Sequence, residues 1–553
     1  MVRYAPLQDG NDAMPMLFDQ VLPAVLRERA RQSADRPFLQ IVDGPTLTYA
    51  DAYARACSIG NGLVTAGIER GECVVIMADN AVDSLCTWLG IHLAAAVEVA
   101  INTGYRGPTL EHTLQNSRAR MIFVEEQYLS RLAEIRDSLT YLETVRVYGA
   151  TSAAEWPELP GLDVRPFEDV LGDSDSAPDR PVRRHDLASV VYTSGTTGPS
   201  KGVMMPHGQI ALFARLGIEN ANMTEDDAHY CFIPLFHVAG KFMAIFGSMI
   251  TGGRVVIDTK FRAETWLARV RQYGATLSHV HGPLVEMIYK EPERPDDADN
   301  PCTRIIASPF PAKIAEDFQR RFGLRGVETW GMTEVTVPVW NPLDEPLRVG
   351  CCGQVRGEHF ELRIVDPDTD EEVETGRTGE LVIRPRRPWT TMAGYLHNPE
   401  ATLSAWRNLW FHSGDLCYVD DEGYVYFVDR AKERIRRRAE NVSSYDIEAA
   451  ALTHPLVKEC AAVGVPSEFE GDDDIQLYVI PTEGAELAPE ELLGHLAGQL
   501  PHFMVPRYLA FVTELARTPT GKTQKAALRT AGIPADVWDR KAAGVSLREL
   551  ARK

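Results

Sequence analysis

The chain has 553 residues, which is too long for one hydrophobic core, so two or more domains are expected. Its 78 acidic and 57 basic residues give a formal net charge of −21. This charge argues against nucleic acid or an anionic membrane as the main partner, because both bind basic surfaces. The sequence has no apolar run near the roughly 20 residues that span a bilayer. It also has no secretion-signal pattern and no cysteines at metal-ligand spacing, so we expect a reducing, cytoplasmic setting.

Strand-like apolar runs alternate with helical patterns over most of the chain, as at 73–80 before 81–96 and at 254–261 before 262–274. This alternation is typical of an α/β protein with mainly parallel sheets. Residues 357–385 read as strands and acidic turns, which predicts a β-rich subdomain. A fresh α/β pattern begins near residue 430, and its roughly 120 residues are enough for a small separate domain.

The join between these regions is basic. Six Lys or Arg residues lie between Arg430 and Arg438 in an otherwise acidic protein. Such a run is either a solvated turn or helix start, or a linker that also meets an anion. Both interpretations stay open at this point.

A loop rich in Gly, Ser and Thr, TSGTTGPSKG at 193–202, follows a short apolar run. Backbone N–H groups and hydroxyls in such a turn surround phosphate oxygens, and a lysine adds a mobile positive charge. The loop is not the P-loop of common NTPases, G-x-x-x-x-G-K-[ST], because Ser200 and Gly202 occupy two required positions. No G-x-G-x-x-G follows an N-terminal strand either, so a dinucleotide-binding fold has no fingerprint.

The pattern T-S-G-T-T-G-x-x-K-G resembles the acyl-adenylate-forming superfamily of acyl-CoA synthetases, luciferases and peptide-synthetase adenylation domains. Further stretches match that family in its expected order, from about residue 25 to about residue 530. They are YCFIPLFHVAG (230–240), ETWGMTE (328–334), TGE (378–380), WFHSGDL (410–416), YVYFVDRAKERI (424–435) and TPTGKTQK (518–525). The join region looks most like the carnitine and crotonobetaine CoA ligase group.

The resemblance implies an ATP-dependent, AMP-forming acid–CoA ligase that uses ATP, Mg²⁺ and CoA. A carboxylate attacks the α-phosphorus of ATP, and CoA thiol then takes the acyl group from acyl-AMP. The implied fold is a large N-terminal domain of stacked mixed sheets and helices with a β-rich subdomain (1–429), and a small mobile α+β domain (430–553). A homodimer is a further expectation.

The resemblance also assigns roles to residues of the nucleotide site. Lys522 would neutralise charge at the α-phosphate, and Glu334 would place magnesium, a cation that prefers oxygen ligands. Asp415 and Arg430 would bind the ribose. The pyrophosphate would be held by Thr193, Ser194, Gly195, Thr196, Thr197, Gly198 and Lys201, and the adenine by Trp330, Gly331 and Thr333.

Lys432 takes the hinge position, and Arg436 and Arg437 are candidates for the CoA phosphates. Ala439 stands where the family usually has a glycine that lines the thiol tunnel, and alanine tolerates fewer backbone angles. This departure leaves a second acceptor class open, such as a carrier thiol, an amine or an oxygen. A non-catalytic nucleotide-binding protein and an ATPase are weaker alternatives.

The acyl pocket is expected near His237, Lys241, His281 and Pro309. Lys241 follows His237 by one helical turn, so in a helix the two share a face. Its ammonium either pairs with a second anionic group on the acid or extends to solvent from a helix end. The identity of the acid stays open.

Overall fold

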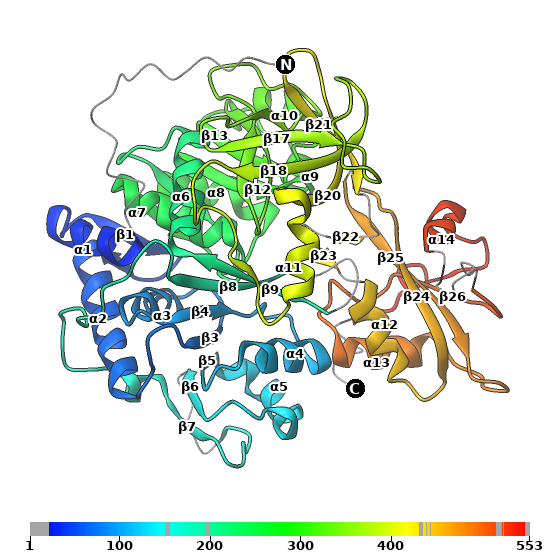
Figure 1. Cartoon of the computed structure of the whole chain (residues 1–553), viewed down its shortest axis with the longest axis horizontal. Helices are drawn as coiled ribbons and strands as arrows, with labels where there is room; N and C mark the ends of the chain where they lie inside the picture. The colour runs from blue at the N-terminus through cyan, green and yellow to red at the C-terminus, as the bar shows by residue number, and fades with distance from the viewer. Residues whose placement is uncertain are drawn as a thin grey trace.

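The computed structural model (Figure 1) describes residues 21–149, 155–193, 199–312, 314–430, 435–437, 440–442, 444–469, 471–515, 523 and 525–547. They form two large sheets with helices, followed by a smaller α+β unit at the C-terminal end. The α/β class expected from the alternating pattern is therefore confirmed. No helix among these residues is both long and apolar enough to cross a membrane.

The larger sheet has thirteen strands and changes character along its width. One half is parallel, and its strands are buried apolar runs because helices cover both faces. This half contains β1 (Pro37–Ile41), β10 (Ala228–Cys231), β11 (Arg254–Ile257), β12 (Leu277–His281), β13 (Arg304–Ser308) and β14 (Arg325–Met332), with β2 (Thr46–Thr48) antiparallel at the edge.

The other half of this sheet is antiparallel and corresponds to the predicted β-rich region. It contains β15 (Thr336–Trp340), β16 (Gly353–Val355), β17 (Phe360–Val365), β18 (Gly379–Pro385), β20 (Phe411–Val419) and β21 (Tyr424–Arg430). β21 ends at Arg430, two residues before the predicted hinge residue Lys432.

The second sheet has eight strands, of which six are parallel. These six are β3 (Cys73–Met77), β4 (Val97–Ala100), β5 (Met121–Glu125), β6 (Thr144–Tyr148), β7 (Asp163–Pro166) and β8 (Leu187–Thr193). At one edge β9 (Lys201–Pro206) pairs antiparallel with β8, and the two-residue β19 (Gly394–Tyr395) pairs with β9. The phosphate loop therefore connects two adjacent strands, β8 and β9.

Helices cover both sheets, and one hydrophobic core joins side chains from the two sheets with those of the helices between them. The longer helices of this region are α1 (Leu22–Gln32), α2 (Tyr49–Thr65), α3 (Val82–Leu93), α4 (Gly107–Ser117), α6 (His207–Ala221), α8 (Ala263–Tyr273), α9 (Gly282–Lys290) and α10 (Ala315–Phe322). Shorter ones are α5 (Leu129–Glu134), α7 (Gly247–Thr251), α11 (Pro399–Ala405) and a π-helix (Ala239–Phe246) that continues into α7. α2 begins at Thr48, which forms a capping box with Asp51.

The C-terminal unit has a separate core and packs beside α4 (Figure 1). A hairpin of β22 (Ile435–Arg437) and β23 (Glu440–Val442) precedes a four-stranded sheet of β24 (Val457–Pro466), β25 (Asp473–Pro481), β26 (Tyr508–Phe511) and β27 (Trp538–Asp539). Its helices are α12 (Ser444–Leu452), α13 (Pro489–Gln499) and α14 (Lys525–Ala531).

Candidate active site

A pocket lies between the N-terminal sheets and the C-terminal unit, and both contribute side chains to its wall. Three of the predicted site residues, Thr193, His237 and Thr333, line this one pocket. They come from β8, from the loop before the π-helix and from the turn after β14. The remaining N-terminal lining includes Ala100, Asn102, Tyr105, Val191, Tyr192, Phe236 and Val238, and the C-terminal lining is Glu440, Asp446, Phe503 and Met504.

Lys201 and Glu334, which the sequence predicts at the phosphates and at the magnesium ion, meet at one tyrosine that the sequence does not single out. Tyr395 donates a hydrogen bond to Oε1 of the buried Glu334 over 3.0 Å. The Lys201 ammonium lies 5.0 Å from the centre of the same ring. Burial, followed by the adjacent carboxylate, raises the pKa of Tyr395 well above its ordinary value, so the hydroxyl stays a donor. The Lys201 ammonium and the oriented Glu334 carboxylate thus share one tyrosine. Lys201 pairs with Thr193 where the two strands flank the loop.

The adenine and ribose candidates are joined directly. The indole N–H of Trp330 donates to Oδ2 of Asp415 over 3.0 Å, and both side chains are buried. The bond fixes the carboxylate predicted to accept the ribose hydroxyls. The backbone at Gly331 leaves no room for a side chain, because a Cβ there would lie 2.3 Å from the carbonyl oxygen of Thr336, the first residue of β15.

Lys241 does not extend to solvent, contrary to one of the two interpretations drawn from the sequence. Its side chain is fully buried, and Nζ lies 2.6 and 2.7 Å from the two carboxylate oxygens of Glu98. Glu98 lies on β4 on the same face as Ala100, two residues before it, and Ala100 lines the pocket. The ammonium behind the pocket wall therefore already has a carboxylate partner.

His237 lines the pocket as an uncharged imidazole. Burial, with a smaller effect of the Lys241 ammonium, lowers the pKa of His237 to about 4. Its Nδ1 accepts a hydrogen bond from the Ala239 amide over 3.3 Å, which places it at the start of the π-helix. Such helices recur at functional sites.

The two arginines expected at the CoA phosphates have different surroundings. Arg436 crosses to the N-terminal sheets and donates to the carbonyl oxygen of Ser308 over 2.9 Å, next to the predicted pocket residue Pro309. Arg437 is buried within the C-terminal unit, where it pairs with Asp474 and donates to the Asp473 carbonyl oxygen. In this arrangement Arg437 is not presented to a ligand, because the alternating side chains of β22 direct it into the unit.

Two carboxyl groups of the C-terminal unit face the pocket from the other side. Glu440 and Asp446 line it together with Tyr105 and Asn102 of the N-terminal part. Burial raises the pKa of Glu440 to about 7, and burial likewise raises the pKa of Asp446 to about 7. The sequence motif did not predict these two residues as site residues.

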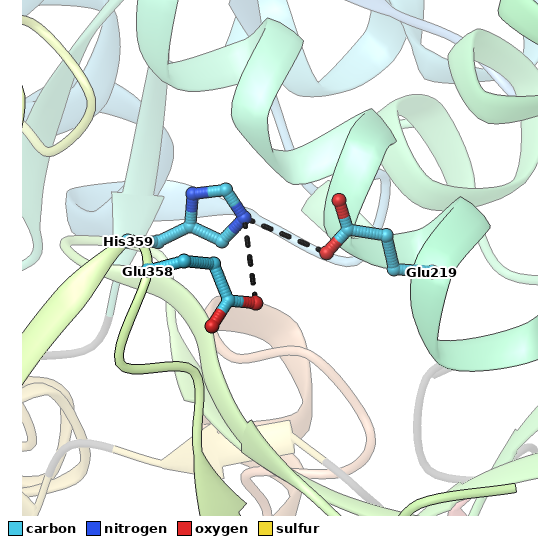
Figure 2. A group of neighbouring side chains, drawn as sticks. All are labelled: Glu219, Glu358 and His359. Carbon is cyan, nitrogen blue, oxygen red and sulfur yellow. Dashed lines mark ion pairs between the residues drawn. The ribbon is translucent and has the colours of Figure 1, made fainter. Parts of the chain in front are cut away.

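A separate cluster of possible metal ligands lies away from Glu334. His359 Nε2 is 3.5 Å from Glu219 Oε2 and 3.9 Å from Glu358 Oε1 (Figure 2). Arg215 already binds Glu219 over 2.6 Å, so a cation compensates this carboxylate. The cluster is an ion-pair network between α6 and the turn before β17, and it does not replace the magnesium site predicted at Glu334.

Several predicted residues lie outside the described part of the chain. These are Ser194, Gly195, Thr196, Thr197, Gly198, Lys432, Ala439 and Lys522, together with the side chains of His281 and Arg430. The roles that the sequence assigns to them stay predictions.

The model of the AMP-binding enzyme family matches residues 26–396. The chain belongs to this family. The model of the AMP-binding enzyme C-terminal domain matches residues 446–522. These two stretches contain the pocket residues of both sides except Glu440.

Relatives of this AMP-binding enzyme are similar along almost their whole length. A sulfoacetate–CoA ligase from Cupriavidus necator is 30% identical over 92% of this chain and 97% of its own. A crotonobetaine/carnitine–CoA ligase from Salmonella typhimurium is 28% identical over 87% of this chain and 93% of its own. The solved structure of ATP-bound MatB from Rhodopseudomonas palustris is 25% identical, with a TM-score of 0.66 over 92% of this chain and 98% of that one. The expected fold class and the expected reaction class, acid–CoA ligation with ATP, Mg²⁺ and CoA, are confirmed by the family and these relatives.

Proposed function

We propose that this acid–CoA ligase activates a monocarboxylic acid with an uncharged tail, and that it uses two arrangements of a 1–429 and a 430–553 domain joined at Lys432. The observation that supports the acid class is the pairing of Lys241 with Glu98. A buried pair has no net charge, so it offers no excess positive charge to a second substrate anion. Ala100, Val191, Phe236 and Val238 add an apolar wall to the pocket.

In the first step, the acid carboxylate attacks the α-phosphorus of ATP, and the bond from that phosphorus to pyrophosphate breaks. Lys201 and the Ser/Thr-rich loop bind the departing phosphates, because fixed donors and cations at developing charge lower such a barrier. Glu334 fits a magnesium ion, since Tyr395 orients its hard oxygen donors. The ion would neutralise phosphate charge. Trp330 orients Asp415 toward the ribose hydroxyls.

In the second step, the CoA sulfur attacks the acyl carbon of acyl-AMP, the bond from that carbon to the AMP oxygen breaks, and the thiol proton is released. The β22–β23 hairpin supplies Glu440 to the pocket, and its Arg436 binds the Ser308 carbonyl oxygen of the N-terminal part. We therefore assign the present arrangement of the two domains to this second step. The role that the family resemblance assigns to Lys522 belongs to the first step and so to the other arrangement.

The acid class is tested by comparing matched acids in a pyrophosphate-release assay with ATP and Mg²⁺. Butyrate and trans-cinnamate represent uncharged tails, and malonate and sulfoacetate carry a second anion. The proposal predicts a higher kcat/KM for an uncharged tail, and an E98Q variant should shift the ratio toward the dianions. A native preference for a dianion would contradict the proposed acid class without contradicting the ligase reaction.

A further inference from the structure

A lysine on α9 and a phenylalanine in a loop of the C-terminal unit meet at the interface between the N-terminal and C-terminal domains. The ammonium of Lys290 lies 4.1 Å from the centre of the Phe469 ring. Lys290 is the last residue of α9, and Phe469 lies in the turn between β24 and β25. The distance is well within the range of a cation–π interaction.

The contact lies beside the predicted acyl pocket. In the same turn, a Cβ on Gly471 would lie 3.5 Å from Pro309 Cγ, so backbone passes directly over this proline. The adjacent Arg436 binds the Ser308 carbonyl oxygen. Lys290 and Phe469 therefore add a side-chain contact to the same interface between the domains as Arg436 with Ser308 and Gly471 with Pro309.

The two domains also contact each other near the start of α4. Gly104 and Gly107 closely approach Pro501, Phe503 and Gln499 of the C-terminal unit. These approaches involve backbone and core side chains. A substitution at these positions would therefore also disturb the packing inside each domain. Lys290 is exposed and Phe469 half-buried, so their contact can be removed without opening a core.

We propose that Lys290 and Phe469 form a latch that holds the C-terminal domain in the arrangement for thioester formation. They are positioning residues, because neither lines the pocket in this structure. The inference rests on the proposed assignment of this arrangement to the second step. A rotation of the C-terminal domain to the arrangement for the first step would carry the β24–β25 turn away from α9 and break the contact.

The variant K541M provides a matched control. Lys541 binds the Glu468 carboxylate over 2.9 Å within the C-terminal unit, and Lys541, followed by a smaller effect of Lys290, lowers the pKa of Glu468. K541M and K290M each remove one exposed ammonium near this carboxylate. Only K290M removes a contact between the domains.

The test measures the two half-reactions separately, using the acid that gives the fastest pyrophosphate release. Adenylation is followed as pyrophosphate formed in a single turnover without CoA, and thioester formation as acyl-CoA formed when CoA is added to that adenylate. K290M and F469L should leave adenylation within twofold and slow thioester formation about 2- to 5-fold. K290R and F469Y should retain the native rate, and the double variant K290M/F469L should be no slower than the single ones.

Hydrogen exchange of the full-length protein supplies a readout that needs no acid. F469L should speed exchange in the peptide 282–290, and K541M should not. Equal losses in both half-reactions, a loss in K541M like that in K290M, or unchanged exchange in F469L would each overturn the latch. If the native enzyme releases no pyrophosphate with any acid, the proposed function is contradicted. The hydrogen-exchange result would still show whether Lys290 and Phe469 hold the two domains together.

Discussion

Lys241 and Glu98 form a fully buried ion pair that joins the π-helix to the second sheet, with both carboxylate oxygens within 2.7 Å of the ammonium. The two residues are 143 positions apart in the chain. His237 lies one turn before the lysine, and Ala100 lies two residues after the glutamate, and both line the pocket. The pair therefore fixes two walls of the pocket relative to each other.

Removing one partner of this pair should be far more harmful than removing both. K241M leaves the Glu98 carboxylate buried without its cation, and we expect a loss of about 3–5 kcal/mol in stability. E98L/K241M replaces the pair with apolar side chains and should recover most of that loss. Thermal and urea unfolding of the three proteins measure the difference. A double variant no more stable than K241M would contradict this account of the pair.

The bond between Trp330 and Asp415 predicts a specific defect in ATP binding. W330F keeps an aromatic ring but removes the N–H donor to a carboxylate, and such bonds contribute about 1.5–3 kcal/mol. The KM for ATP should rise at least several-fold, while the KM for the acid stays unchanged. W340F is the control, because Trp340 is buried on the adjacent strand and stacks with Arg356. Similar ATP kinetics in W330F and W340F would count against the assignment.

Tyr395 should control the use of magnesium. Y395F removes the hydroxyl that orients the Glu334 carboxylate while keeping the ring beside Lys201. We expect adenylation to slow about 10- to 100-fold, as for loss of one hydrogen bond to a charged group, and the magnesium concentration for half-maximal rate to rise. Titration of the pyrophosphate-release rate with Mg²⁺ measures both. An unchanged magnesium requirement would separate Tyr395 from the metal site.

Glu440 and Asp446 predict a pH dependence of the second step. Burial in the seam raises each pKa to about 7, so this arrangement of the domains binds more protons than one that exposes the two groups. Proton binding by the two groups stabilises this arrangement fully below the ordinary carboxyl pKa. This stabilisation is lost as the pH rises through about 7. The rate of thioester formation in the native enzyme, relative to E440Q/D446N, should fall about 3- to 10-fold between pH 6.5 and 8. The thiol ionisation of CoA affects both proteins and cancels in this ratio.

A ratio that does not change with pH would show that neither carboxyl group titrates in this step. Adenylation measured over the same pH range is the internal control, since we assign the first step to the other arrangement of the domains.

The two adjacent arginines of β22 should fail in different ways. Arg437 is buried against Asp474, and Arg507 binds the same carboxylate over 2.7 Å, so R437A should destabilise the C-terminal unit by about 1.5–3 kcal/mol, as for loss of a hydrogen bond to a charged group. R436A removes a seam contact and a candidate CoA-phosphate ligand, and should raise the KM for CoA without lowering the unfolding temperature. Unfolding curves and CoA kinetics of the two variants distinguish these effects. Equal unfolding temperatures would contradict the assignment of Arg437 to the core.

The sequence could predict the fold class because strand and helix periods are local properties of the chain. Ordered motifs also located Thr193, Thr333 and His237, which share one pocket, and Lys201 and Glu334, which meet at Tyr395. The motifs carry this information because a phosphate loop and a metal ligand need particular residue types at fixed spacing.

Partners that are distant in the chain could not be predicted in the same way. Tyr395 lies on a two-residue strand that has no periodic signal of its own. Glu98 is a single acidic residue in an apolar strand, and nothing near it indicates Lys241 as its partner. The basic run near the predicted hinge indicates cations but not their directions. The sequence therefore does not distinguish Arg437, which is buried in the C-terminal unit, from Arg436, which contacts Ser308.

Pyrophosphate release with ATP and Mg²⁺, measured with and without CoA, tests the central claim most directly. The acids would be butyrate, trans-cinnamate, malonate, sulfoacetate and carnitine, with E334Q as the inactive control. The account predicts slow release that stops near one equivalent for an acid with an uncharged tail, and sustained turnover to acyl-CoA once CoA is added. Release that CoA does not change, or no release with any of these acids despite ATP binding, would contradict it.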